Sequence, residues 1–136
     1  MIKHNLGDLN RMLNSYLDDI QEDIEQLAES VADEGVKKLK NTKNLYKVRS
    51  GKYNKNWRKR VDKGFNEVQA TIYNSRYGSL THLLEDGHAT RDGGHTRAFK
   101  HIKPVENMVV DEFEKGVEDI IRRNSKWLIM KLLPIY

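Results

Sequence analysis

The first forty residues have apolar side chains at intervals of three or four, which is the repeat of one face of an α-helix. The opposite face is acidic between Asp18 and Glu29. The pattern predicts a helix from about Asp8 to about Leu39, roughly 45–50 Å long at about 1.5 Å per residue. Such a helix is longer than a small core, so we expect part of its apolar stripe to pack on another subunit. The stripe consists of Leu6, Leu9, Leu13, Tyr16 or Leu17, Ile20, Ile24, Leu27 and Val31.

The periodicity changes to strict alternation after residues 41–55, which are polar and read as an exposed loop. Residues 57–62 alternate in type, and residues 67–73 do the same on the far side of a Gly-containing turn at 63–66. Two alternating segments around such a turn predict an antiparallel β-hairpin. We expect Trp57 and Val61 to face the core and Arg58 and Arg60 to face solvent.

The second half of the chain begins with a short predicted helix, Tyr77–Glu85, which has three leucines on one side. A glycine-rich loop follows over residues 87–94, and residues 96–102 are interpreted as a further short strand. Pro104 suits the first turn of a helix, and apolar residues then recur at intervals of three or four as far as Arg123. The order predicts an α+β fold: a long N-terminal helix, an antiparallel sheet built on a hairpin, a short helix with a Gly-rich loop, and an amphipathic C-terminal helix.

The last residues form an apolar segment, Trp127–Tyr136, which Lys131 and Pro134 interrupt. Pro134 argues against a helix that continues to the end. We therefore assign residues 1–124 to one domain and 125–136 to an apolar tail, which either folds back or offers a partner site. The segment is too short to span a membrane, and the first residues do not resemble a secretory signal.

Charge is segregated along the 136 residues, although the net charge is only +4. Residues 1–36 hold two basic and nine acidic side chains (net −7), residues 37–63 hold twelve basic and one acidic (net +11), and the remainder is balanced. This pattern indicates head-to-tail contact between copies, attraction to a polyanion, or simply two solvated faces. Cysteine is absent, which excludes disulfides, thiol catalysis and cysteine-based metal sites.

Histidines and acids gather between residues 82 and 101, as a metal-dependent nuclease would require. His82 and Glu85 would share a helix face, as paired ligands can. However, the sequence has no His-Glu-x-x-His arrangement, no phosphate-binding glycine motif and no nucleophile elbow. We therefore favour contact roles for these residues and expect neither catalysis nor a cofactor. The metal-ligand candidates are His82, Glu85, Asp86, His88, Asp92, His95 and His101.

The basic segment Lys37–Lys63 interleaves Tyr46, Tyr53 and Trp57 among its charges. Basic and aromatic side chains together can bind nucleic acid through phosphates and base stacking. No helix-turn-helix or zinc-finger pattern supports base reading, so the alternative function is non-specific DNA binding. The candidates for contact with DNA or with an acidic partner are Lys47, Arg49, Lys52, Lys55, Arg58 and Arg60.

Two short runs, Leu80-Thr-His-Leu-Leu-Glu-Asp-Gly87 and His101-Ile-Lys-Pro104, resemble the hallmark segment of a family of small phage tail-component proteins. The family is also described as the tail-completion or head–tail joining proteins of long-tailed bacteriophages. Ser50-Gly51 with Trp57 is similar to the element before the family's first strand. The resemblance covers about residues 5–123, with Lys100 where proline is common and Tyr53 near the usual leucine.

The resemblance implies an α+β subunit without catalytic activity that assembles as a ring, typically of six copies, between the capsid connector and the tail. It implies a virion protein made in the host cytoplasm, whose partners are its own copies, neighbouring neck and tail proteins and, in the lumen, genome DNA. No membrane is involved. The predicted contact residues are His82, Glu85, Gly87, His88, Arg91, Gly93, Gly94, His95, Arg97 and His101.

Overall fold

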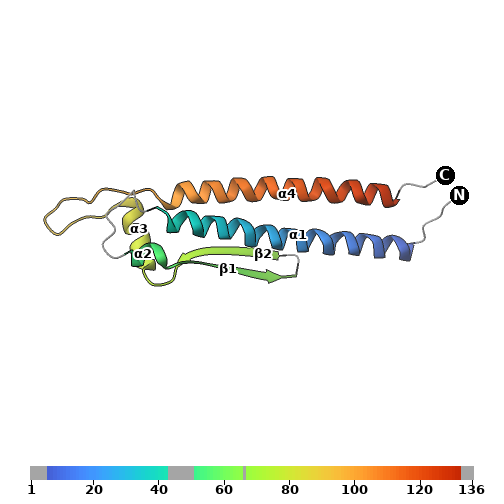
Figure 1. Cartoon of the computed structure of the whole chain (residues 1–136), viewed down its shortest axis with the longest axis horizontal. Coiled ribbons are helices and arrows are strands. Elements are labelled where there is room, and N and C mark those ends of the chain that lie inside the picture. Colours follow the sequence, from blue (N-terminus) through green and yellow to red (C-terminus); the bar gives the residue numbers. More distant parts are fainter. Residues whose placement is uncertain (1–5, 43–50, 66, 133–136) are drawn as a thin grey trace.

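The computed structural model describes residues 6–42, 51–65 and 67–132. It confirms the predicted α+β fold, which combines two long helices, a β-hairpin and two short helices (Figure 1). The elements are α1 (Leu6–Lys40), α2 (Lys52–Lys55), β1 (Trp57–Gly64), β2 (Glu67–Asn74), α3 (Gly78–Asp86) and α4 (Ile102–Leu132).

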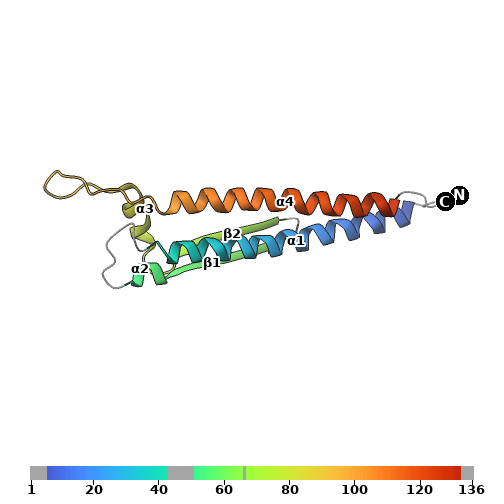
Figure 2. The ribbon, with the colours of Figure 1, turned by 45° about the horizontal axis from the view of Figure 1, so that its top comes forward.

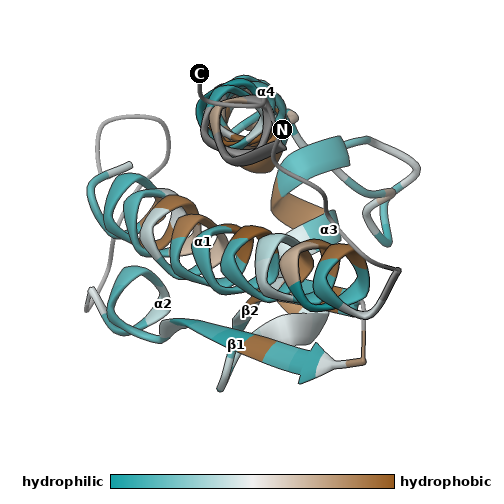
Figure 3. Ribbon diagram, turned by 90° about the vertical axis from the view of Figure 1, so that its right-hand side faces the viewer, coloured by the Kyte–Doolittle hydropathy of each residue, from teal (hydrophilic) through white to brown (hydrophobic). Residues whose placement is uncertain are grey.

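Helix α1 is the central element, because it packs against α4 on one side and against the hairpin on the other (Figures 1 and 2). The view along the helices shows α4, α1 and the hairpin as three successive layers, with α3 beside them (Figure 3). The start of α1 and the end of α4 extend together beyond the hairpin turn. The loop between α3 and α4 projects from the opposite end of the molecule.

The hairpin is antiparallel, with Trp57 opposite Asn74 and Gly64 opposite Glu67. Its inner face lies on α1, and Trp57, only 3% exposed, belongs to the buried core. Arg58 and Arg60 are exposed, as the alternation predicts. The core lies at the loop end of the molecule and combines residues from both long helices, α2 and the hairpin. It consists of Leu39, Trp57 and Val105, with Val36, Tyr53, Ile72, Ile102 and Val109 packed around them.

Two ion pairs join the hairpin to the acidic side of α1. The Lys59 ammonium lies 2.7 Å from Glu29 Oε2 and 2.8 Å from Asp33 Oδ1. The hydrogen bond from Lys59 holds the pKa of the Glu29 carboxyl below its ordinary value. Part of the acidic block and part of the basic block therefore neutralise each other within one chain.

Gly35 lies where α1, β2 and α4 meet. A Cβ atom at this position would lie 2.6 Å from Ile72 Cδ1 and 2.9 Å from Val109 Cγ2. Glycine inside a helix is less favourable than alanine by roughly 1 kcal/mol. Helix propensity therefore does not explain Gly35, but the close approach of Ile72 and Val109 does. Gly116 of α4 has the same role against Leu27 of α1.

Three local predictions are wrong. The polar segment that ends at Lys55 contains the single-turn helix α2, because Gly51 with φ 72° starts a turn that Tyr53 anchors in the core. Residues 96–101 form no strand; Phe99 N–H instead bonds the carbonyl of Leu84 in α3. Finally, α4 does not end at Arg123 as predicted but continues to Leu132.

A carboxyl pair on the two long helices makes stability depend on pH. Glu112 of α4 shares a hydrogen bond with Glu34 of α1, and this bond raises the pKa of Glu112 above its ordinary 4.5. The raised pKa means that the shared proton stabilises the fold below about pH 4.5, and that this contribution is lost as pH rises through the pKa of the folded state.

Glu112→Gln should therefore raise the melting temperature at pH 7, because the glutamine amide donates to Glu34 without a charge. The gain should shrink as pH falls below 4.5, the ordinary value for Glu112. Melting curves recorded by circular dichroism across this range measure the effect, with the exposed Glu118→Gln as control. An equal gain at every pH would contradict the shared proton.

Candidate partner-binding site

The base of the projecting loop is held by one buried carboxylate, Glu85, at the end of α3. Its oxygens accept hydrogen bonds from the backbone N–H groups of His101, Ile102 and Lys103 at 3.0–3.1 Å. The next residue, Pro104, has no N–H group. Glu85 therefore satisfies the free donors at the start of α4, and its negative charge also suits the positive end of the helix.

His101 fills the space behind this cap and is 1% exposed. Its Nδ1 lies 2.7 Å from the carbonyl oxygen of Phe99, and its Nε2 lies 2.8 Å from the Tyr53 hydroxyl. Since a carbonyl can only accept, Nδ1 donates to Phe99, and in the neutral ring Nε2 accepts from Tyr53. The rings of Tyr53 and Trp57 contact the imidazole edge-on. His101 thus joins the loop to α2 and β1.

Asn74 secures the other side of the same corner. Its amide nitrogen donates to the carbonyl of Tyr53, and its amide oxygen accepts from the N–H groups of Arg76 and Tyr77. The side chain is buried, and it fixes the turn that leads from β2 into α3. The orientation of α3, and with it the direction of the loop, follows from these bonds.

Residues 87–97 form an arm that extends away from the rest of the molecule (Figures 1 and 2). Ala89 pairs with His95 as an isolated bridge, and Thr96 N–H bonds the carbonyl of His88. At the tip, Asp92 accepts from the Thr90 hydroxyl and from Gly94 N–H, and these bonds lower the pKa of Asp92. The arm therefore has internal order despite its glycines.

Gly87 is the hinge between α3 and the arm. Its φ of 71° lies in the region that favours glycine, and a Cβ atom there would lie 2.5 Å from the carbonyl oxygen of Thr96. Beside it, the Lys100 ammonium lies 2.7 Å from Asp86, and the bond lowers the pKa of Asp86. The two sides of the arm are thus joined at its base.

The predicted contact residues separate into two groups. Glu85 and His101 are buried, and in this structure they hold the base of the arm. Gly87 is half-buried at the hinge. The others are exposed. His82 lies on α3, and the rest lie on the arm: His88, Arg91, Gly93, Gly94, His95 and Arg97. No group of three or more acidic or histidine side chains that could hold a metal ion occurs in the described ranges.

The basic candidates lie away from the arm, on α2 and β1. Lys52, Lys55, Arg58 and Arg60 are exposed, whereas Lys47 and Arg49 fall outside the described residues. Arg60 is paired with Asp62, and Arg58 donates to the carbonyl of Lys55. The exposed side of β1 and α2 is therefore basic.

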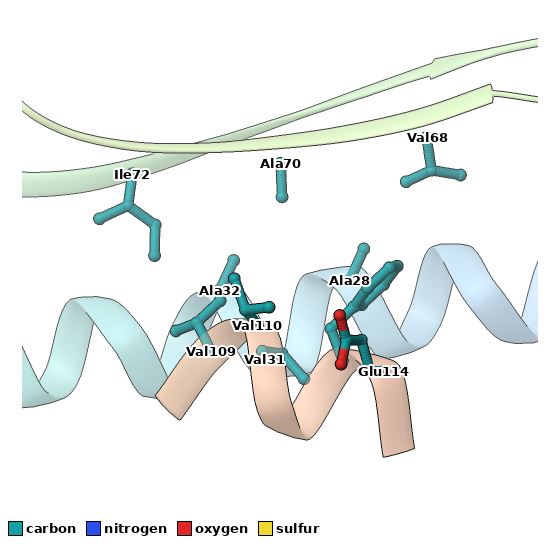
Figure 4. Close-up of a pocket in the computed structure, with 10 residues that line it drawn as sticks. Ala28, Val31, Ala32, Val68, Ala70, Ile72, Val109, Val110 and Glu114 are labelled. Atoms are coloured by element: carbon teal, nitrogen blue, oxygen red, sulfur yellow. The ribbon is translucent and has the colours of Figure 1, made fainter. Parts of the chain in front are cut away.

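A second candidate surface, which sequence reasoning missed, is an apolar groove between β2 and α4 (Figure 4). We call it the β2–α4 groove. It consists of adjoining hollows of about 280, 400 and 330 Å³, with α1 as the floor. Its central part is lined by Ala28, Val31 and Ala32 of α1, Val68, Ala70 and Ile72 of β2, and Val109, Val110 and Phe113 of α4. The alternation in β2 showed which residues face inward, but not that α4 leaves them uncovered.

In a comparison with family models, residues 7–87 match the family described as "Bacteriophage HK97-gp10, putative tail-component". The matched range includes α1, α2, the hairpin and α3 up to the hinge. No match was found among curated proteins or among solved structures. Within the described residues, no helix has the length and apolar character needed to cross a membrane.

Replacing Glu85 tests the role of the buried cap. Glu85→Ala leaves three backbone donors without a partner, and we expect the free energy of unfolding to fall by about 1.5–3 kcal/mol. Glu85→Gln should recover part of the loss, because one amide oxygen still accepts. Urea unfolding measures both, and Glu106→Ala, an exposed acid in the first turns of α4, is the control. Equal effects of Glu85→Ala and Glu106→Ala would contradict the cap.

Proposed function

Because the chain belongs to the bacteriophage HK97-gp10-like tail-component family, we propose that it is a structural subunit of the head–tail neck rather than an enzyme. In this proposal, copies form a closed ring, six in number, between the capsid connector and the tail. The ring links the two parts of the virion. The observation that carries the proposal is the family match, which places the chain among phage tail components.

The exposed apolar surface of the subunit supports assembly. Leu13 and Leu17 on the long stripe of α1 are 38% and 57% exposed, and Ile121 of α4 is 46% exposed. Both long helices therefore expose apolar side chains. The β2–α4 groove adds a second apolar surface. Burial of such surface is the main source of free energy in protein association.

The arm supports contact with a neighbouring ring. It projects from one end of the subunit (Figure 1), and its exposed side chains include His88, Arg91 and His95. Its base is fixed by Glu85 and His101, so binding a partner should cost the arm little conformational entropy. The exposed basic side of β1 and α2 would face an acidic neighbour or the DNA that passes through the lumen.

Non-specific DNA binding remains the alternative function. Lys52, Lys55, Arg58 and Arg60 are exposed and could neutralise phosphates. However, Lys59 of the same basic segment is paired with Glu29 and Asp33. Part of the segment's positive charge therefore forms ion pairs within the chain, so the net charge of the segment is not by itself strong support for DNA binding.

Ring formation can be measured by light scattering during size-exclusion chromatography. We expect the full chain, alone or mixed with neighbouring neck proteins, to give a species of six times the 15.9 kDa monomer mass. The ring should persist at high salt if its contacts are mainly apolar. A strict monomer in every mixture would sink the proposal.

The arm can be tested separately from the ring. Arg91→Ala should leave the subunit's own ring intact but weaken its capture by the adjacent neck ring at least about tenfold, since exposed arginines often dominate interfaces. Arg122→Ala, at the other end of α4, is the matched control and should change neither property. Binding is measured by pull-down of the assembled ring with the purified neighbour. Unchanged capture would rule out Arg91 as a contact.

A further inference from the structure

The register of the hairpin directs a row of β2 backbone groups outward. Gly64 pairs with Glu67 across a two-residue turn, so this pair and every second pair along the ladder exchange hydrogen bonds. The intervening residues Val68, Ala70 and Ile72 therefore point their N–H and C=O groups away from β1. In the part of the chain that the structure describes, β2 pairs with no strand other than β1.

The same three residues place their side chains in the β2–α4 groove. Figure 4 shows Val68, Ala70 and Ile72 directed from β2 towards the helices. The open backbone edge and the apolar hollow therefore lie at one place. An extended segment added beside β2 would bond this edge and lie beside the groove.

The charges of the two strands indicate which segment fits. β1 has four basic residues and one acidic residue, whereas β2 has one acidic residue, Glu67, and no basic residue. Across the groove, α4 adds Glu106 and Glu114 to the lining. Opposite charges on adjacent strands are favourable and like charges are not, so pairing of β2 with a β1 strand is favoured over pairing of two β1 strands.

We infer that the β2 edge and the β2–α4 groove bind the free edge of β1 of a second copy. The inference rests on the proposed ring and names the interface that closes it. Each copy would use β2 on one side and β1 on the other, so the contact is head-to-tail. Repeated around the proposed closed ring, such a contact leaves neither edge of the hairpin unpaired.

Ala70→Pro tests the interface without breaking the subunit. The N–H group of Ala70 points away from β1, so proline removes only a donor that the hairpin does not use, and proline is tolerated at such edge positions. We expect Ala70→Pro to keep the circular dichroism spectrum of the wild type but to elute as a 15.9 kDa monomer where the wild type forms its ring. Ala70→Ser, which keeps the N–H group, is the matched control and should form the ring.

The outcomes distinguish the interface from the ring. If the wild type forms a ring and folded Ala70→Pro forms the same ring, the interface is wrong and the proposed function stands. If the wild type never forms a ring, alone or with neck proteins, both fail. Loss of the ring in Ala70→Pro only, with Ala70→Ser intact, supports both.

A labelling experiment covers the case in which Ala70→Pro does not fold. Because the chain has no cysteine, Ala70→Cys introduces a single thiol. A bulky maleimide should react with it in the monomer and then prevent assembly, whereas the preformed ring should protect it at least tenfold. Gln69→Cys, on the outer face of the same strand, is the control and should react in both forms. Equal reactivity of Ala70→Cys in ring and monomer would overturn the inference.

Discussion

The bond between Glu85 and the start of α4 determines how the two halves of the molecule fit together. One buried carboxylate accepts from three consecutive N–H groups, and Pro104 removes the need for a fourth acceptor. The cap fixes where α4 begins and therefore how it lies along α1. It also brings both ends of residues 87–101 to one place, so the arm must project. The position of the arm's base and the start of α4 thus have a common cause.

The sequence was sufficient to predict the elements whose signals are local. The three-to-four repeat identified α1, the alternation identified the hairpin with Trp57 inside, and Pro104 marked the first turn of α4. The extension of α4 beyond Arg123 was not predicted, because Pro134 was interpreted as evidence against a helix in the last residues. The cap was missed because Glu85 and His101 lie sixteen residues apart and looked like candidate ligands or contacts. Their burial depends on Tyr53 and Trp57, which no local pattern connects with them.

The β2–α4 groove could not be predicted for a related reason. Alternation in β2 indicates that Val68, Ala70 and Ile72 face one side, but any helix could have covered them. Whether α4 does so depends on the distance at which it packs on α1, and two glycines set that distance. At Gly35 and Gly116, side chains of the opposing elements occupy the space that a Cβ atom would need. Helix α4 is therefore held close to α1, and a hollow remains between α4 and β2.

A two-stranded sheet is marginal in water unless something packs on it. Here α1 covers the inner face, and Lys59 bonds Glu29 and Asp33, so the hairpin is stabilised within the chain. That arrangement uses only part of the segregated charge. Arg58 and Arg60 stay on the exposed side of β1, while Glu106 and Glu114 stay beside the groove. The charge that folding leaves over is thus basic at one edge of the hairpin and acidic near the other. In the proposed ring of identical subunits, each basic edge would lie beside an acidic one.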